Sequence, residues 1–228
     1  MSEKVIIFGL GKMAQLAWFY LTHDSRYEVA GFTVDRDYIT EQSFCGLPVV
    51  PFESVTETHP PAAYKMYVAV GYTKLNSIRR IKYYEAKEKG YTLISYLSSK
   101  ATHWGDTKIG DNTFIMENQV IQPFVTIGDN VIIWSGNHFG HDVVVENHVF
   151  MASHIVASGG VSIGESSFVG VNVTIRDNIT VGRECIIGAG AVILRNTKDK
   201  EVYVAKSTEP YPLDSERFER MMEISRKS

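Results

Sequence analysis

Four of the seven histidines in the chain lie within seventeen residues of one another, at His138, His141, His148 and His154. An imidazole has an ordinary pKa of about 6.5, so its neutral form is abundant at neutral pH and can accept a proton from a reacting group. His141 is the best placed of the four, because a glycine precedes it and an acidic residue, Asp142, follows it. His141 is therefore the candidate general base.

Two other interpretations of these histidines stay open at this point. Any one of them can be a solvated or packed structural residue. Three of them can also hold zinc, as three histidines do in the trimeric β-helix carbonic anhydrases, and spacing alone does not exclude a site assembled between coils or subunits. The matching pattern of Arg, Asp and His is missing around the cluster, so the interpretation that we favour includes no metal.

The stretch that carries the histidines has a six-residue hydrophobic repeat. Every sixth residue is apolar at fifteen consecutive positions, which are Ile109, Ile115, Ile121, Ile127, Ile133, Phe139, Val145, Met151, Ala157, Ile163, Val169, Ile175, Val181, Ile187 and Ile193. This repeat is typical of a β-helix, in which each short strand points one side chain into the stack and each turn needs a small residue. Three hexads per coil predict about five coils of eighteen residues over residues 109–206.

The three positions of the repeat that are not Ile or Val surround the histidines. They are Phe139, Met151 and Ala157. Departures from a local rule are expected where function competes with folding. This coincidence predicts that the functional site lies in the same zone.

The first 97 residues alternate between expected strands and helices. An apolar run over residues 5–8 ends at Gly9-Leu-Gly-Lys-Met-Ala14, and helical periodicity follows to about residue 22. The further elements are strands over residues 29–34, 47–52, 66–70 and 91–97, and a helix over residues 75–89 before Gly90. The alternation predicts a small, doubly wound, Rossmann-like α/β domain with a parallel sheet over residues 1–97.

Two segments complete the expected organisation. Residues 98–108 are interpreted as the linker between the domains. Beyond the repeat, residues 207–228 form a tail, in which residues 213–227 have the pattern of an amphipathic helix. We expect this helix to cap the open end of the coils, where unpaired strand edges would otherwise be exposed.

The overall composition is that of an ordinary globular protein, with 44% hydrophobic and 21% charged residues. A net charge of −3 argues against a nucleic-acid-binding protein, which usually needs a basic face. The two cysteines, Cys45 and Cys185, fall in different predicted domains, so a disulfide framework is not expected and a reducing compartment fits. We expect no signal peptide and no membrane span, and hence a cytoplasmic protein.

Several motifs of the repeat resemble those of the hexapeptide-repeat acyltransferases: Gly140-His-Asp-Val-Val-Val145, Ser158-Gly-Gly-Val-Ser-Ile-Gly164, Phe168-Val-Gly170 and Ile187-Gly-Ala-Gly-Ala-Val192. To about Lys206, the chain looks more closely like the bacterial sugar acetyltransferases that join a small nucleotide-binding domain to a left-handed β-helix. These are the sialic-acid O-acetyltransferase and the bacillosamine and perosamine N-acetyltransferase group. The resemblance implies left-handed coils, a homotrimer with active sites at subunit interfaces, acetyl-CoA as cosubstrate, and a role in polysaccharide or glycan biosynthesis.

The same resemblance implies catalytic roles. In that family a histidine at the position of His141 takes a proton from the acceptor as it attacks the thioester, and the acidic neighbour, here Asp142, orients the imidazole and raises its basicity. The oxyanion donor of the family matches Gly159. Gly159 also lies one coil of eighteen residues beyond His141, so its N–H is expected about 4.8 Å from the base.

Acetyl-CoA is implied to lie in the groove between neighbouring β-helices, near backbone at positions that match Val171 and Ala189. The family often has a second histidine on the cofactor at the position of Phe150. The Gly-Val-Pro-Ala-Lys ending of the family is reduced here to Val204-Ala-Lys206.

The motif Gly9-x-Gly11-x-x-Ala14 follows a strand and opens a helix, an arrangement that brings backbone amides to a phosphate. By itself it is also compatible with a packed turn that binds nothing. By resemblance, the nucleotide diphosphate of a sugar substrate lies at the carboxyl ends of the strands, on Gly11, Lys12, Met13, Asp35, Arg36 and Gly71. Relatives often carry Gly-Gly-His where this chain has Lys12-Met13. Tyr72, Asn76 and Arg79 are expected to add polar contacts.

These observations predict an acetyl-CoA-dependent N-acetyltransferase that acts on a nucleotide-linked amino sugar, with His141 as general base. A sugar O-acetyltransferase of the same fold is the alternative enzyme. The alternative from another class is a trimeric scaffold or sugar-binding protein without catalysis. We favour it less, because His141 and Asp142 are present.

Overall fold

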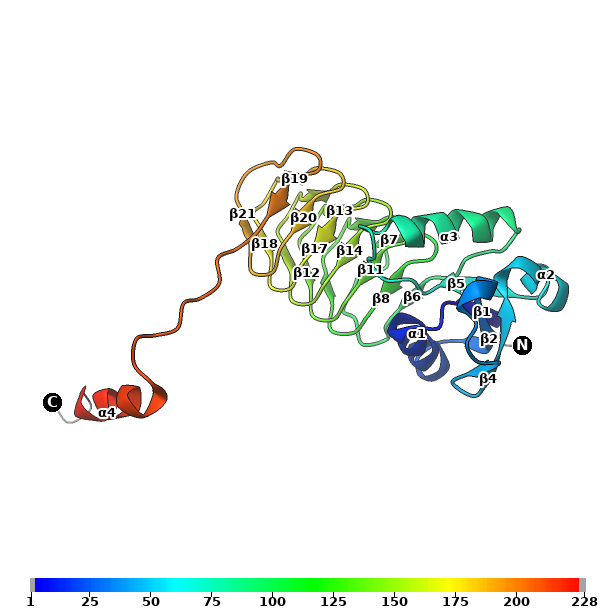
Figure 1. Ribbon diagram of the computed structural model, residues 1–228. Helices are drawn as coiled ribbons and strands as arrows, with labels where there is room; N and C mark the ends of the chain where they lie inside the picture. Colours follow the sequence, from blue (N-terminus) through cyan, green and yellow to red (C-terminus); the bar gives the residue numbers. More distant parts are fainter. Residues whose placement is uncertain (1–2, 226–228) are drawn as a thin grey trace.

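The computed structural model describes residues 3–225 as two domains and a C-terminal tail. The N-terminal α/β domain lies against one end of a long β-helix, and helix α4 (Ser215–Ser225) stands beyond the other end on an extended segment (Figure 1). None of the described helices is long and apolar enough to span a bilayer.

The N-terminal domain is built on a sheet in the order β3-β4-β2-β1-β5, parallel except for the hairpin of β3 with β4. Apolar residues of α1 pack on one face of the sheet and those of α3 on the other. The elements are β1 (Glu3–Phe8), α1 (Lys12–His23), β2 (Tyr27–Val34), η1 (Arg36–Tyr38), β3 (Ser43–Phe44), β4 (Leu47–Pro51), η2 (Phe52–Ser54), α2 (Val55–Thr58), β5 (Lys65–Val68) and α3 (Ser77–Glu88). The predicted doubly wound α/β domain is confirmed, with one antiparallel strand at its edge.

The strand expected over residues 91–97 is not a fifth strand of this sheet. Leu93 makes an isolated bridge to Met66, and β6 (Tyr96–Leu97) pairs with the β-helix instead. Tyr96 contacts both domains here, since its hydroxyl donates a 2.6 Å hydrogen bond to Asp24 while its ring packs on Phe114. One short segment is thereby shared between the two domains.

The β-helix consists of three parallel sheets around a triangular core. Sheet 1 contains β7 (Lys108–Ile109), β10 (Thr126–Ile127), β13 (Val144–Val145), β16 (Ser162–Ile163) and β19 (Thr180–Val181). Sheet 2 contains β6, β8 (Phe114–Ile115), β11 (Ile132–Ile133), β14 (Phe150–Met151), β17 (Phe168–Val169), β20 (Ile186–Ile187) and β22 (Val202–Tyr203). Sheet 3 contains β9 (Val120–Ile121), β12 (His138–Phe139), β15 (Val156–Ala157), β18 (Thr174–Ile175) and β21 (Val192–Ile193).

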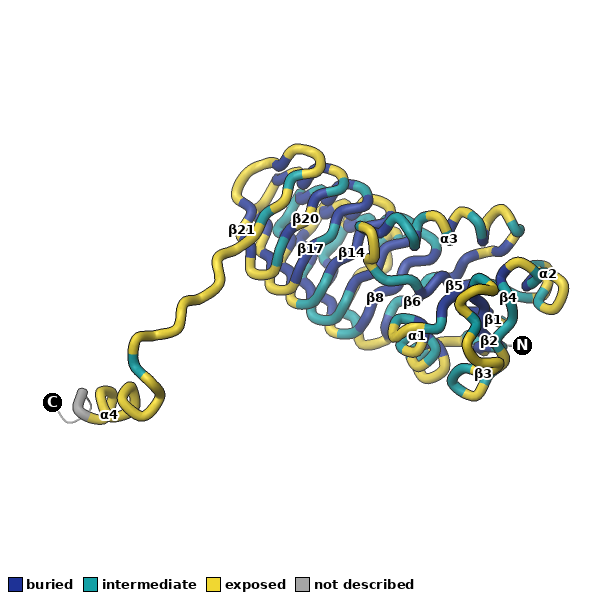
Figure 2. Tube along the Cα trace, viewed as in Figure 1, coloured by how far each residue is buried: buried dark blue, intermediate teal, exposed yellow. Residues whose placement is uncertain are grey.

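The predicted repeat is confirmed strand by strand. Each of its fifteen apolar residues is the second residue of one of the strands β7 to β21, and all except the partly buried Ile109 are in the core. Neighbouring coils are in register at a spacing of eighteen residues, as in the pairing of Ile109 with Ile127 and of Ile127 with Val145. In Figure 2 these inward positions form the buried interior of the coils.

The departures from Ile and Val in the repeat have a packing reason. Phe139 pairs directly with Ala157 on the next coil, and both are fully buried. The small alanine therefore makes room for the large phenylalanine, as close packing requires. Met151 is also fully buried in the same core. That the functional site lies in the zone between these residues stays a prediction.

The prediction that the C-terminal helix caps the open end of the coils is wrong. The predicted helix exists as α4, from Ser215 to Ser225, and its expected final residues 226–227 lie outside the described residues. It stands away from the coils on an extended, exposed segment (Figure 2). The last coil is finished instead by β22, which pairs with β20, and by the Thr197 hydroxyl, which accepts a 2.8 Å hydrogen bond from the Gly182 N–H.

Candidate active site

His141 lies in the turn from sheet 3 to sheet 1, between β12 and β13. Its Nδ1 is 2.8 Å from the Asp142 carboxylate, so Nδ1 carries the proton and Nε2 keeps its lone pair. The His141 backbone N–H donates to the Gln122 side chain at 2.9 Å. Both side chains remain open to solvent, with 65% of His141 and 61% of Asp142 exposed. The arrangement gives an oriented imidazole whose free nitrogen can accept a proton.

Gly159 is stacked beside this imidazole, one coil further along. A Cβ added at Gly159 would lie 2.6 Å from His141 Nε2 and 2.8 Å from its Cε1. The N–H of the next residue, Gly160, donates to the His141 carbonyl at 2.9 Å. Within residues 3–225 the Gly159 N–H itself donates to no protein acceptor. A free backbone donor therefore lies beside the free nitrogen of His141.

We expect Gly159→Ala to lower kcat by about 100-fold, because the added methyl group would displace the imidazole and small misplacements of reacting groups are that costly. The measurement is thiol release from the acyl donor. Gly105→Ala is the matched control, because an added Cβ there meets nothing within 4 Å. An unchanged kcat for Gly159→Ala would contradict the placement of the base.

The structure does not bring the other three histidines to His141. His138 lies on the outer face of sheet 3, His154 in the exposed turn from sheet 2 to sheet 3, and His148 in the turn from sheet 1 to sheet 2. These histidines, although close in the sequence, therefore lie on different sides of the triangular coil. Across the described part of the chain, no group of three or more His, Cys, Asp or Glu residues could hold a metal ion.

His148 is fully buried where the two domains meet. The Asn130 amide donates to its Nδ1 at 2.8 Å, and its Nε2 lies 3.3 Å from the Tyr84 hydroxyl. Burial lowers the pKa of His148 to about 4. His148 is therefore a neutral structural residue at physiological pH.

The buried His148 makes stability depend on pH. Its pKa is lower in the folded chain than in the unfolded chain, so the unfolded chain binds more protons between about pH 4 and pH 6.5. The free energy of unfolding should therefore fall as the pH drops through this window. His148→Asn should weaken this dependence, because an asparagine side chain does not titrate. Asparagine should fit the position, since it already occupies the equivalent corner at Asn112 and Asn130. Urea unfolding at pH 7 and pH 4.5 measures it, and equal pH dependence in the two proteins would refute the assignment.

Five of the six residues expected to bind the substrate line one hollow of about 650 Å³ in the N-terminal domain. Gly11, Lys12 and Met13 lie at the start of α1, Asp35 follows β2, and Gly71 follows β5. Gly9 permits this tight turn, because its φ is +123° and an added Cβ would lie 2.9 Å from the Ala69 carbonyl. Arg36 is not among the residues that line the hollow, and its backbone N–H donates to Glu53.

The lining residues that were not predicted include Tyr38 and Lys82. Tyr38 is an aromatic residue in η1 that is 69% exposed. Lys82 on α3 donates 2.7 Å hydrogen bonds to Asp35 and Glu85. Tyr38 could have been predicted from the sequence, because this tyrosine follows shortly after a predicted strand. Lys82 could not, because its position depends on how α3 packs on the sheet.

Arg79 and Asn76 do not line this hollow, although polar contacts were expected from them. Arg79 is fully buried between the domains and donates to the carbonyls of Gly71, Asn130, His148 and Val149 and to the Asn76 side chain. The Asn76 amide in turn donates to the Ser166 carbonyl at 3.0 Å. Burial lowers the pKa of Arg79 to about 10, so it stays charged at neutral pH. These two side chains fix the N-terminal domain to the β-helix.

The residues expected to contact the cofactor fall in two places. Val171 and Ala189 stack one coil apart in the turns from sheet 2 to sheet 3, where the Gly190 N–H donates to the Val171 carbonyl. Phe150 lies elsewhere, on the outer face of sheet 2, buried under Tyr72 and stacked on Phe168. The His141 turn belongs to a different corner of the same coils. On one chain, these residues therefore face different sides of the coils.

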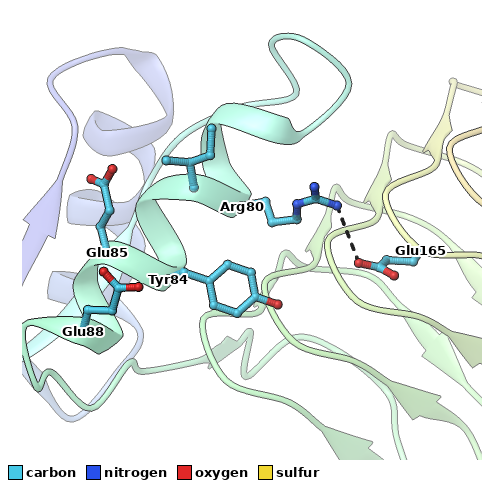
Figure 3. Close-up of a pocket in the computed structure, with 6 residues that line it drawn as sticks. Arg80, Tyr84, Glu85, Glu88 and Glu165 are labelled. Atoms are coloured by element: carbon cyan, nitrogen blue, oxygen red, sulfur yellow. Dashed lines mark ion pairs between the residues drawn. The ribbon is translucent and has the colours of Figure 1, made fainter.

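A separate hollow of about 430 Å³ lies between α3 and the coils (Figure 3). Arg80 points across it toward Glu165, 3.8 Å away, and Glu165 also pairs with Arg183. None of the predicted site residues lines this hollow. Arg80 and Glu165 pair with each other and Glu85 pairs with Lys82, so we assign no chemistry to this hollow.

Comparison with known proteins finds similarity both in the repeats and in the overall fold. Residues 106–138 and 160–195 match the bacterial transferase hexapeptide family (six repeats). The acetyltransferase domain of PglB from Neisseria gonorrhoeae is 26% identical, with a TM-score of 0.75 over 88% of this chain and 95% of that structure. The repeats of the chain are thus similar to those of bacterial hexapeptide transferases, and its whole fold is similar to that of a sugar acetyltransferase. The resemblance to the sugar acetyltransferases of this fold is thereby confirmed.

Two further similar proteins are informative. PerB from Caulobacter crescentus, solved with CoA and GDP-perosamine, is 25% identical, with a TM-score of 0.77 over 87% of this chain and 92% of that structure. A curated relative from Burkholderia lata, acyl-[acyl-carrier-protein]–UDP-N-acetylglucosamine O-acyltransferase, is 26% identical over 42% of this chain. The match covers 36% of that relative, so the chain spans about a third of its length there.

Proposed function

We propose that this acyltransferase moves the acetyl group of acetyl-CoA to the amine of a nucleotide-linked amino sugar. The single observation that carries the proposal is the oriented His141 imidazole, with Asp142 at Nδ1 and the Gly159 backbone beside Nε2. The relatives solved with acetyl-CoA and with CoA and GDP-perosamine support the choice of both substrates.

The proposed reaction needs two groups from the protein. The acceptor nitrogen attacks the thioester carbon while His141 Nε2 takes a proton from that nitrogen. The negative charge that develops on the carbonyl oxygen is stabilised by the Gly159 N–H. A C–N bond forms, the C–S bond breaks, and the proton held by His141 passes to the CoA thiolate. Asp142 keeps the imidazole in the tautomer that this step requires.

The substrates meet between copies of the chain in this proposal. His141, the Val171–Ala189 column and the hollow of the N-terminal domain occupy different sides of one chain. A homotrimer would place the His141 corner of one subunit against the neighbour that holds the nucleotide. The nucleotide diphosphate lies in the hollow beside Lys12, at the N-terminus of α1, whose backbone N–H groups attract anions. Because both cysteines are free, we expect the enzyme to work in the cytoplasm.

Mass spectrometry tests the proposal directly. The purified protein is incubated with acetyl-CoA and a panel of nucleotide amino sugars, and the products are analysed for a gain of one acetyl group on nitrogen. Acetylation of a nucleotide sugar that lacks a free amine would identify the O-acetyltransferase instead. Thermal stabilisation by neither acetyl-CoA nor any nucleotide sugar, together with no product, would favour the scaffold.

A further inference from the structure

The turn 122–124 lies one coil before the His141 turn, 140–142, and these two turns have no free backbone donor. Pro123 has no N–H group. The N–H groups of the other five residues are occupied, and their acceptors are, in chain order, the Phe139 carbonyl, the Asp106 carboxylate, the Ala157 carbonyl, the Gln122 side chain and the Pro123 carbonyl. The free N–H beside His141 is therefore that of Gly159, one coil further along, on the opposite side of the imidazole.

This asymmetry separates the two substrates of the proposed reaction. The thioester oxygen needs a hydrogen-bond donor, so the acyl group lies on the Gly159 side of His141. The positions expected to contact acetyl-CoA, Val171 and Ala189, also lie toward the C-terminal end of the coils. The amine must still come within hydrogen-bond distance of His141 Nε2. The rest of the acceptor is therefore directed away from the cofactor, toward the preceding turn 122–124.

Phe124 is the exposed aromatic residue of this preceding turn. Its side chain is 67% exposed. It occupies the place equivalent to Asp142 one coil earlier, because Thr126 pairs with Val144, and neighbouring coils lie about 4.8 Å apart. Phe124 thus presents an apolar face beside the pair of His141 and Asp142.

Phe124 departs from the rule that the other turns of the coils follow. Its φ is +68°, a conformation that is strained for a bulky side chain. The other residues with positive φ in the described coils, 109–206, are glycines or polar residues, and those that are asparagines are Asn112, Asn118, Asn130, Asn172 and Asn178. An asparagine at position 124 would avoid both the strain and the exposed ring. Backbone strain of this kind is common at ligand sites, and packing within the coils does not explain the phenyl ring.

We propose that the sugar ring of the acceptor lies on the Phe124 ring, with its amino group directed to His141 Nε2. The inference rests on the proposed function and names a binding residue for its acceptor. One face of a pyranose carries mainly C–H groups, which pack well on an aromatic ring, and the sugar ring is about as wide as one coil spacing. Asp106 accepts the Phe124 N–H at 2.9 Å and thereby fixes the turn. Phe124 binds the sugar, while the bond changes are those of the proposed acetyl transfer.

Steady-state kinetics of Phe124→Asn test the inference, with acetyl-CoA and a nucleotide amino sugar that the wild type acetylates. The KM of the nucleotide amino sugar should rise about tenfold, which is the usual size of effect when one stacking contact is lost. The KM of acetyl-CoA should stay unchanged, because the cofactor lies on the other side of His141. Phe124→Tyr keeps an aromatic ring and should restore the wild-type KM. Phe19→Asn is the matched control, because Phe19 is a 51% exposed phenylalanine on α1, and both of its KM values should be those of the wild type.

Thermal unfolding and light scattering distinguish a binding role from a structural one. Asparagine is the residue that several other turns use in this conformation, so Phe124→Asn should unfold at the same temperature as the wild type or a higher one. A lower melting temperature with an unchanged acceptor KM would make Phe124 a structural residue and overturn the inference. Dissociation of the oligomer by Phe124→Asn would make the ring a contact between copies and would overturn it as well.

The kinetic outcomes also separate this inference from the proposed function. A Phe124→Asn enzyme that is active with a wild-type KM for the acceptor would remove Phe124 from the sugar site and leave the acetyltransferase proposal standing. A rise in the KM of acetyl-CoA alone would reverse the assignment of the two sides of His141. If the wild type acetylates none of the nucleotide amino sugars, the proposed function fails and this inference fails with it.

Discussion

Replacing His141 by alanine is expected to lower kcat by about 10²- to 10⁴-fold. In the proposed mechanism, the substitution removes the group that accepts the proton from the attacking amine, while the Gly159 N–H and both proposed substrate sites remain. His141 is 65% exposed and lies outside the core, so the fold and the oligomer should be retained. The measurement is acetyl-CoA-dependent thiol release with a nucleotide amino sugar, with the oligomeric state measured on the same sample.

His23→Asn is the control for this experiment. His23 is another exposed histidine and lies in the last turn of α1. This variant should keep wild-type turnover because His23 lies outside the His141 turn, the Val171–Ala189 column and the hollow of the N-terminal domain. Near-wild-type turnover for His141→Ala, measured in a preparation free of other transferases, would remove His141 from the mechanism.

Arg79→Leu should lower the free energy of unfolding by about 3–5 kcal/mol. Arg79 is fully buried and is the donor to carbonyl groups from both domains. Leucine would leave these carbonyl oxygens buried without their donor, and each such group costs about 1–3 kcal/mol. The measurement is urea-induced unfolding followed by circular dichroism.

Arg80→Leu provides the comparison on the next residue of the same helix. Arg80 is 42% exposed and makes an ion pair with Glu165 at 3.8 Å. Exposed ion pairs contribute about 0–1 kcal/mol, so this variant should unfold almost as the wild type does. If Arg79→Leu lowers the free energy of unfolding no more than Arg80→Leu does, the hydrogen bonds of Arg79 do not hold the two domains together.

The β-helix could be predicted almost completely from the sequence, because in a solenoid the spacing along the chain is also the spacing in space. A period of six places each residue directly beside the residue eighteen positions later. This rule predicted the inward column and the closeness of Gly159 to His141. The ends of the solenoid escaped it, because the repeat stops at Ile193 and neither β22 nor the position of α4 follows from the period.

The hollow of the N-terminal domain was predicted in part. Gly11, Asp35 and Gly71 follow parallel strands, whose carboxyl ends share one edge of the sheet. Lys82 reaches the same hollow from helix α3. Which face of a helix packs on the sheet is not marked by a short sequence motif, whereas the end of a strand is. The exclusion of Arg36 likewise depends on a tertiary contact, the hydrogen bond of its backbone to Glu53.

By itself, then, the sequence determined the repeat, the α/β start and the pairing of His141 with Asp142 and Gly159, since each depends on short or periodic spacing. Only the tertiary structure decided that the four histidines separate around the coil, that Phe139 is large because Ala157 is small, and that Arg79 is buried between domains. The reason is that contacts between the domains join residues far apart in the chain, such as Arg79 and His148, and no periodic pattern records them.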